Sequence, residues 1–133
     1  MDSPIKIAII EDDPTINQMY RMKFESEGFD VQLADNGRAG IALVKDFLPD
    51  IILLDLKMPE MNGDEALAEI RSNDWGKTIP VIILTNTGLE ESPGELDSLG
   101  ISSYILKAEL TPHQVVTKVK ETLDAQTSPS SQS

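Results

Sequence analysis

The sequence predicts an α/β fold in which a parallel sheet is covered by helices on both faces. Short apolar runs alternate along the chain with segments whose apolar residues have helical spacing, and this alternation is typical of consecutive β–α–β units. Runs such as Ile51–Leu54 are apolar at every position rather than at every second one, which indicates strands that are buried on both sides.

The expected strands are, in chain order, Ile5–Ile10, Val31–Ala34, Ile51–Asp55, Val81–Thr85 and Ser103–Leu106. The expected helices are Pro14–Ser26, Arg38–Asp46, Asp64–Arg71, Pro93–Leu99 and Pro112–Asp124. In the first helix Asp13 suits the N-cap, Pro14 suits the first helical position, and Gly28 ends the helix. Its helical spacing is carried by mostly apolar residues, namely Ile16, Met19, Tyr20, Lys23 and Phe24.

The later helices have weaker boundary signals. Pro59 breaks the chain after the third strand, and Gly63 closes that loop before the third helix. The fourth helix is expected to be short because its segment is interrupted by Gly88, Pro93 and Gly94. Thr111 caps the last helix, after which the composition turns to Ser, Gln and Pro. We therefore expect one domain over residues 1–125 and a disordered tail or linker over residues 126–133.

Composition excludes several classes of function. At 133 residues, 40% of them hydrophobic and 26% charged, the chain fits one globular domain with a single core. A net charge of −12 opposes direct binding to nucleic acid or to an anionic membrane. The absence of cysteine excludes disulfides, zinc–thiolate sites and thiol catalysis. With no signal peptide and no apolar run near the roughly 18 residues of a membrane span, a cytoplasmic protein is expected.

Polar residues follow four of the expected strands. They are Glu11, Asp12, Asp13, Asp55, Thr85 and Lys107. Because the carboxyl ends of parallel strands meet at one edge of a sheet, these side chains are expected to converge on one crevice. Clustered carboxylates repel one another unless a cation neutralises them, and Mg²⁺ prefers such hard oxygen ligands. A hydroxyl and an ammonium group beside them would suit a phosphoryl group.

Each of these residues alone has an ordinary structural explanation. Asp55 could cap the loop that follows its strand, Thr85 could be a plain strand-end hydroxyl, and Lys107 could be a solvated surface lysine. Asp13 is already used as the N-cap, which leaves Glu11 and Asp12 to the site. The combination at four strand ends favours the functional interpretation.

With these residues the chain closely resembles a response-regulator receiver domain of two-component signalling, of the chemotaxis-regulator type. The matching segments are Glu11–Pro14, Leu54–Gly63, Thr85 and Tyr104–Lys107. The resemblance covers about residues 5–124. It implies a flavodoxin-like, doubly wound sheet of five parallel strands in the order 2-1-3-4-5, with five helices.

The resemblance also implies roles at the site. Asp55 would accept a phosphoryl group from a sensor histidine kinase or a histidine phosphotransfer protein. Asp12, Asp55 and the backbone carbonyl of Lys57 would hold Mg²⁺, or Mn²⁺ in its place, and Glu11 would hold it through water. Lys107 would pair with the phosphoryl oxygens.

The implied output is a conformational switch. Thr85 would move toward the phosphoryl group, and Tyr104 would change its burial along with it. The partner would be an unknown output protein or domain, and the chain would be a monomer or a phosphorylation-linked dimer. The domain would catalyse only its own phosphorylation and dephosphorylation and would not be a metabolic enzyme.

Some positions depart from the family pattern. Ala108 stands where the family usually has proline, often after a cis bond, and a non-proline cis bond costs about 2.5–4 kcal/mol. Asn86 stands where the family usually has a small residue. The resemblance implies that Lys57 and Thr87 occupy positions that flank the phosphoryl site in this family and help set the phosphoryl lifetime. The break at Pro93-Gly94 falls in the family's main output helix.

Two other functions stay open at this point. A phosphohydrolase of the haloacid-dehalogenase type would carry a second Asp two residues after the nucleophile, where this chain has Lys57. A degenerate receiver that binds partners without phosphorylation would not need the intact set of site residues. A phosphate-binding loop ending at Gly76-Lys77-Thr78 is rejected because Arg71 stands at its first glycine. The one histidine, His113, is expected to be exposed and without a catalytic role.

Overall fold

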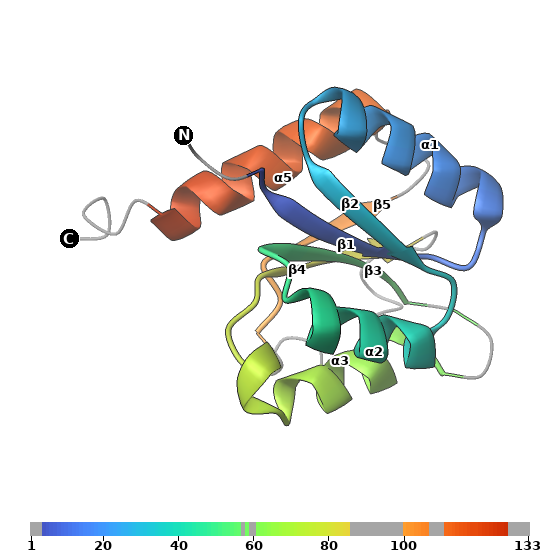
Figure 1. Cartoon of the computed structure of the whole chain (residues 1–133), viewed down its shortest axis with the longest axis vertical. Coiled ribbons are helices and arrows are strands. Elements are labelled where there is room, and N and C mark those ends of the chain that lie inside the picture. The colour runs from blue at the N-terminus through green and yellow to red at the C-terminus, as the bar shows by residue number, and fades with distance from the viewer. Residues whose placement is uncertain (1–3, 57, 59–60, 86–99, 107–110, 128–133) are drawn as a thin grey trace.

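A computed structural model of the chain describes residues 4–56, 58, 61–85, 100–106 and 111–127 (Figure 1). These residues form one sheet of five parallel strands in the order β2-β1-β3-β4-β5, as predicted. The strands are β1 (Lys6–Ile10), β2 (Asp30–Ala34), β3 (Ile51–Asp55), β4 (Val81–Thr85) and β5 (Ser103–Leu106). The helices are α1 (Pro14–Ser26), α2 (Gly37–Phe47), α3 (Gly63–Arg71) and α5 (Pro112–Thr127), with a 3₁₀ turn η1 (Asp74–Gly76).

Most element boundaries agree with the sequence to within one residue. The helix predicted at Pro93–Leu99 lies outside the described residues. At the end of the chain, α5 continues to Thr127, past the expected helix end at Asp124, while the domain limit at residue 125 stays a prediction. Helix α2 begins at Gly37 because the side chain of Asn36 caps it, accepting the backbone N–H of Ala39 at 2.8 Å.

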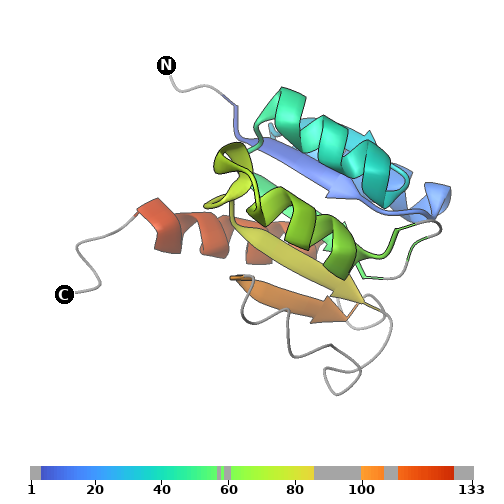
Figure 2. The ribbon, with the colours of Figure 1, turned by 90° about the horizontal axis from the view of Figure 1, so that it is seen from below.

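The sheet separates two apolar layers (Figures 1 and 2). Helices α1 and α5 cover one face, where Phe24 and Val116 pack on Ile9 and its neighbours. Helices α2 and α3 lie side by side on the other face over the layer that contains Ile10. Alternate residues of each strand thus enter opposite layers, which explains why the central runs in β1, β3 and β4 are apolar at every position.

The apolar face of α1 includes Ile16, Tyr20 and Phe24, as predicted, but not Met19. The buried residues of this helix are Asn17, Tyr20 and Phe24, whereas Met19 is 41% exposed. Tyr20 and Phe24 were expected, but a polar residue completes the stripe in place of Met19. The prediction for Met19 was wrong because spacing alone does not distinguish neighbouring positions on a helix, and Asn17 makes a buried hydrogen bond at its own position.

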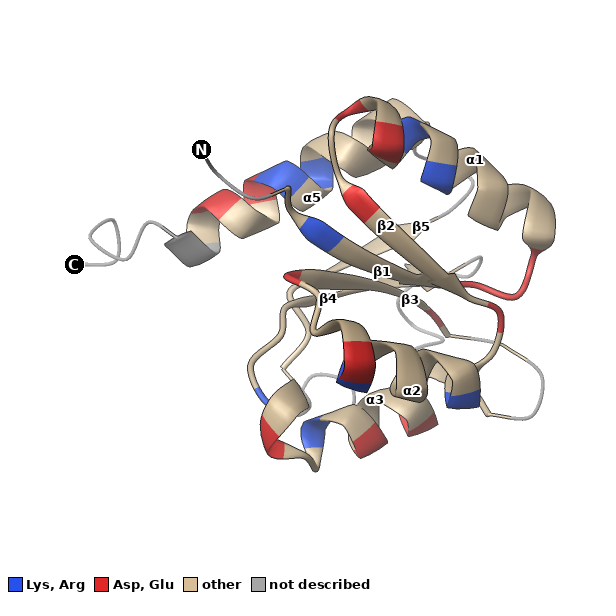
Figure 3. Cartoon of the chain, viewed as in Figure 1, with Lys and Arg blue, Asp and Glu red and all other residues tan. Residues whose placement is uncertain are grey.

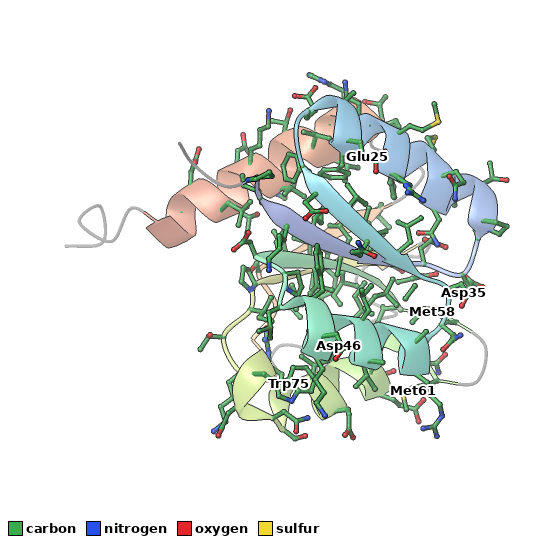
Figure 4. All side chains as sticks on the ribbon, viewed as in Figure 1. Glu25, Asp35, Asp46, Met58, Met61 and Trp75 are labelled. Atoms are coloured by element: carbon green, nitrogen blue, oxygen red, sulfur yellow. The ribbon has the colours of Figure 1, made fainter. Side chains whose placement is uncertain are left out.

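The amino ends of the strands are tied together by side chains that bind backbone carbonyls. Arg71 donates to the carbonyls of Gly76, Ile79 and Gly100 at 2.7, 2.8 and 3.0 Å, and burial lowers the pKa of this guanidinium. Trp75, in η1, packs on the layer under α2 and α3 (Figure 4). In the described part of the chain, no helix has the length and apolar character needed to span a membrane.

Helices α1 and α5 are joined by a cluster of ion pairs around the side chain of Glu27. Its carboxylate lies 3.1 Å from Lys120 of α5 and 3.3 Å from Lys23 of α1. The hydrogen bond from Lys120 is the main cause that lowers the pKa of Glu27 below its ordinary value of 4.5, followed by the hydrogen bond from Lys23. The cluster joins residues 93 positions apart in the chain.

This cluster should make stability depend on pH. Because the folded pKa of Glu27 is lowered, its ionised form stabilises the fold fully above the unfolded pKa, and this contribution is lost as pH falls through the folded pKa. We expect Glu27→Gln to reduce the free energy of unfolding at pH 7. The difference from the wild type should shrink once the pH falls below about 4.5. Urea unfolding followed by circular dichroism at several pH values measures it.

Glu25→Gln is the matched control. Glu25 lies on the same helix and contacts Arg21 one turn away (Figure 4), so its loss removes the same charge without affecting the link to α5. A Glu27→Gln effect that stays constant from pH 7 to pH 3, or one that Glu25→Gln reproduces, would contradict the assignment.

Candidate functional site

The polar residues that follow the strands gather at the carboxyl edge of the sheet. Figure 3 shows the acidic segment between β1 and α1 at this edge. Oxygen atoms of Glu11, Asp12 and Asp55 all lie within 4.8 Å of one another. The side chains of Glu11 and Asp55 are 0% and 4% exposed, whereas Asp12 faces solvent. The structure thus brings together the three carboxylates that the sequence placed at one site.

The turn after β1 is fixed by hydrogen bonds at each residue that shapes it. The N–H of Glu11 donates to the carbonyl of Ala34 at 3.0 Å and so extends the β1–β2 ladder. The N–H of Asp13 donates to Glu11 Oε2 at 3.0 Å. Asp13 Oδ1 accepts the N–H groups of Thr15 and Ile16. The predicted division is therefore present: Asp13 caps α1, and Glu11 and Asp12 belong to the cluster.

One residue that holds this turn in place, Asn17 of α1, was not predicted from the sequence. The side-chain Nδ2 of Asn17 donates to the carbonyl oxygen of Glu11 at 2.6 Å. Its buried position in α1 is the only signal that separates it from an ordinary helix-surface asparagine, and that position was not visible in the apolar spacing.

Asp55 is held at the end of the buried strand β3. It is paired in register with Leu84 of β4, and the ladder continues with Leu56 N–H donating to the carbonyl of Leu84 at 3.1 Å. The loop then returns so that Gly63 N–H donates to the carbonyl of Leu56 at 2.8 Å. A Cβ at Gly63 would overlap the carbonyl oxygen of Asp55. The glycine that the sequence placed at the loop end is therefore needed for this close approach.

Thr85 and Tyr104 lie on the same side of the sheet beyond Asp55. Thr85, 3% exposed, is paired with Leu106, and Tyr104 is paired with Ile83. Because side chains alternate along a strand, both face the layer under α2 and α3, where Tyr104 is partly buried. Two predicted site residues, Lys57 and Lys107, lie outside the described residues, as do Asn86, Thr87 and Ala108.

The donor set fits a hard divalent cation. Two oxygens bound directly to Mg²⁺ at about 2.1 Å lie at most about 4.2 Å apart. The three carboxylate oxygens lie within 4.8 Å of one another, so all three are close enough to reach one such ion, either directly or through a water molecule.

This fold, with an acidic cluster at the carboxyl edge of a 2-1-3-4-5 sheet, defines the class of response regulator receiver domains. The family model of that domain matches residues 7–120, and the chain belongs to this family of signalling domains. The Regulatory protein AtoC of Escherichia coli K12 is 35% identical over 102 residues, which are 77% of this chain and 22% of that protein. Transcriptional regulatory protein ResD of Bacillus subtilis is 36% identical over 118 residues, which are 89% of this chain and 48% of that protein.

Solved structures agree with this assignment. A CheY-like response regulator receiver domain protein from Methanospirillum hungatei is 30% identical, with a TM-score of 0.83. The match covers 93% of this chain and 97% of that one. The chain spans about a fifth of AtoC and about half of ResD. The expected family and strand order are thereby confirmed.

The close approach at Gly63 predicts a sensitive position. In Gly63→Ala the added methyl group meets backbone atoms of Asp55 and Leu56 rather than a flexible side chain, so the β3–α3 loop must shift. We expect a loss of about 1–3 kcal/mol in the free energy of unfolding, measured by urea denaturation, together with weaker Mg²⁺ binding, measured by calorimetric titration.

Gly28→Ala separates strain from the site. Gly28 has φ +93°, yet nothing lies within 4 Å of a Cβ added there. This variant should lose stability through its left-handed backbone while Mg²⁺ affinity stays at the wild-type value. Equal Mg²⁺ affinity in the wild type and in Gly63→Ala would show that the loop does not shape the site.

Proposed function

We propose that this receiver domain is a phosphoryl-accepting switch in which Asp55 takes its phosphoryl group from the phosphohistidine of a sensor kinase or a histidine phosphotransfer protein. The observation that supports this most is a buried carboxylate at a strand end, with two further carboxylates within 4.8 Å. Membership of the receiver family supports the general function.

The chemistry is a transfer between two nucleophiles. A carboxylate oxygen of Asp55 forms a bond to phosphorus while the bond to the donor imidazole nitrogen breaks, and the nitrogen keeps the electron pair and takes up a proton. A divalent ion, Mg²⁺ or Mn²⁺, held by Asp12, Asp55 and the Lys57 carbonyl, with Glu11 through water, would neutralise charge on the phosphoryl oxygens. Lys107 would pair with the same oxygens. The product is a mixed anhydride, which water hydrolyses, so the signal is transient.

The output side of the proposal involves Thr85 and Tyr104. Both face the same layer, on strands adjacent to each other. The hydroxyl of Thr85 would hydrogen-bond to the new phosphoryl group, and the ring of Tyr104 would change its burial in response. The surface around Thr85 and Tyr104 would act on an output protein or domain. The chain would be a monomer or a phosphorylation-linked dimer. The similarity to AtoC and ResD, which are regulatory proteins longer than this chain, supports an output of this kind.

Asp55→Asn tests the phosphoacceptor. After incubation with Mg²⁺ and acetyl phosphate, the intact mass of the wild type should show one phosphoryl adduct that is stable in acid and labile in base. Asp55→Asn should show none, because an amide cannot attack phosphorus in this way. Removal of Mg²⁺ with EDTA should abolish the wild-type adduct as well.

Asp30→Asn is the matched control. Asp30 is an exposed carboxylate at the start of β2, at the opposite edge of the sheet, so this variant should label like the wild type. An adduct of wild-type yield on Asp55→Asn, in protein that retains the wild-type circular dichroism spectrum, would refute the assignment of Asp55.

Thr85→Ala tests the switch separately from the chemistry. The two tyrosines can be followed by NMR of ¹³C-labelled rings, with Tyr20 in the α1–α5 layer as an internal control. In the wild type, phosphorylation should shift the ring signals of Tyr104. In Thr85→Ala, Asp55 should still be labelled while the Tyr104 signals stay in place. A Tyr104 shift of wild-type size in labelled Thr85→Ala would show that the hydroxyl does not couple the two residues.

A further inference from the structure

Asn17 is a polar residue buried in the apolar face of α1. It is 5% exposed and shares its side of the helix with Tyr20 and Phe24. An amide in such a position costs free energy unless it is hydrogen-bonded. Its contacts therefore show what this side chain does in the fold.

Asn17 holds both ends of the acidic turn between β1 and α1. Its side-chain Nδ2 donates to the carbonyl of Glu11 at 2.6 Å, and its backbone N–H donates to the carbonyl of Asp13 at 2.9 Å. The side chain reaches back to Glu11 because side chains on a helix tilt toward its N-terminus. The residue between these two anchored carbonyls is Asp12.

The other half of the amide makes no bond. Oδ1 of Asn17 is buried and has no hydrogen-bond partner within the part of the chain that the structure describes. A leucine at this position would have a similar size and would avoid burying an unpaired oxygen. The donor to Glu11 is thus the chemical feature of Asn17 that this position uses, and the unpaired oxygen is a cost that accompanies it.

The Nδ2 group of Asn17 binds the peptide unit that connects Glu11 and Asp12, two of the three carboxylate residues. The carbonyl of Glu11 and the N–H of Asp12 belong to one planar group, so fixing that carbonyl also fixes the direction in which the backbone enters Asp12. Asp12 is exposed and is not held by packing. The direction of its side chain therefore depends on the conformation of its backbone. Glu11, by contrast, is also held by its own carboxylate bond to Asp13 N–H.

We propose that Asn17 is a positioning residue for divalent-cation binding: through the Glu11 carbonyl it orients the Glu11–Asp12 peptide so that both carboxylates face Asp55. This inference rests on the proposed function, in which these carboxylates hold the ion. It assigns no contact between Asn17 and the ion itself.

The test is the Mg²⁺ affinity of the purified chain, measured by calorimetric titration without any phosphoryl donor. Asn17→Leu keeps the volume and removes the donor, and Asn17→Asp keeps the shape but places an oxygen against the Glu11 carbonyl. We expect the dissociation constant for Mg²⁺ to rise about 10–100-fold in both, the range found for groups that orient metal ligands. The rise in Asn17→Asp is the more telling, since an added negative charge by itself would tighten cation binding.

Two further variants make the outcomes distinguishable. Phe24→Leu removes packing from the same face of α1, about two turns beyond Asn17, and should leave Mg²⁺ affinity unchanged. Asp12→Asn removes a proposed ligand and should weaken Mg²⁺ binding. If Asp12→Asn binds Mg²⁺ weakly while both folded Asn17 variants bind it like the wild type, the positioning role is wrong and the proposed site stands. If Asp12→Asn binds Mg²⁺ like the wild type, the proposed metal site is wrong, and this inference fails with it.

Discussion

Repulsion among three carboxylates held within 4.8 Å is the constraint on which the rest of the structure depends. Two unit charges at that separation repel by about 3 kcal/mol at an effective dielectric constant of about 20, which is a large part of a typical domain stability of about 5–15 kcal/mol. The fold offsets this repulsion locally. Glu11 accepts the N–H of Asp13, and the cluster lies beside the positive N-terminal end of α1. A bound divalent cation would offset the remainder.

The two edges of the sheet differ in the charge of the side chains that shape them. At the amino edge, basic side chains bind backbone carbonyls: Lys6 Nζ reaches the carbonyl of Phe47 at 2.8 Å and lies over its ring, while Arg71 gathers three carbonyls beyond α3. These contacts fasten connections between strands and helices. At the carboxyl edge, acidic residues face one another and close backbone approach at Gly63 shapes the loop.

The sequence predicts those features that depend on local rules. Strand β3 follows from an apolar residue at every position, and the start of α1 follows from Asp13 and Pro14 as cap and first helical residue. The strand order that brings Asp55 next to β1 came from the family resemblance, since periodicity does not encode which strands pair. Asn17 was missed because helical spacing cannot distinguish a buried amide from an exposed one. The prediction ended α5 at Asp124, which was too early. The helix continues to Thr127 because no helix-breaking residue stands between these two positions.

The surroundings of Asp55 differ between its β1 side and its β4 side. On the β1 side, Glu11 donates its N–H to the carbonyl of Ala34 and accepts hydrogen bonds from Asp13 N–H and from Asn17 Nδ2, which fixes the acidic turn. On the β4 side lies Thr85, at the end of the strand. Tyr104 lies on the adjacent strand β5, where it is paired with Ile83 of β4. In the proposed function, a phosphoryl group on Asp55 would have this turn on one side and the side chain of Thr85 on the other. Because the turn is held by hydrogen bonds to its backbone at Glu11 and Asp13, the proposed response is expected on the β4–β5 side.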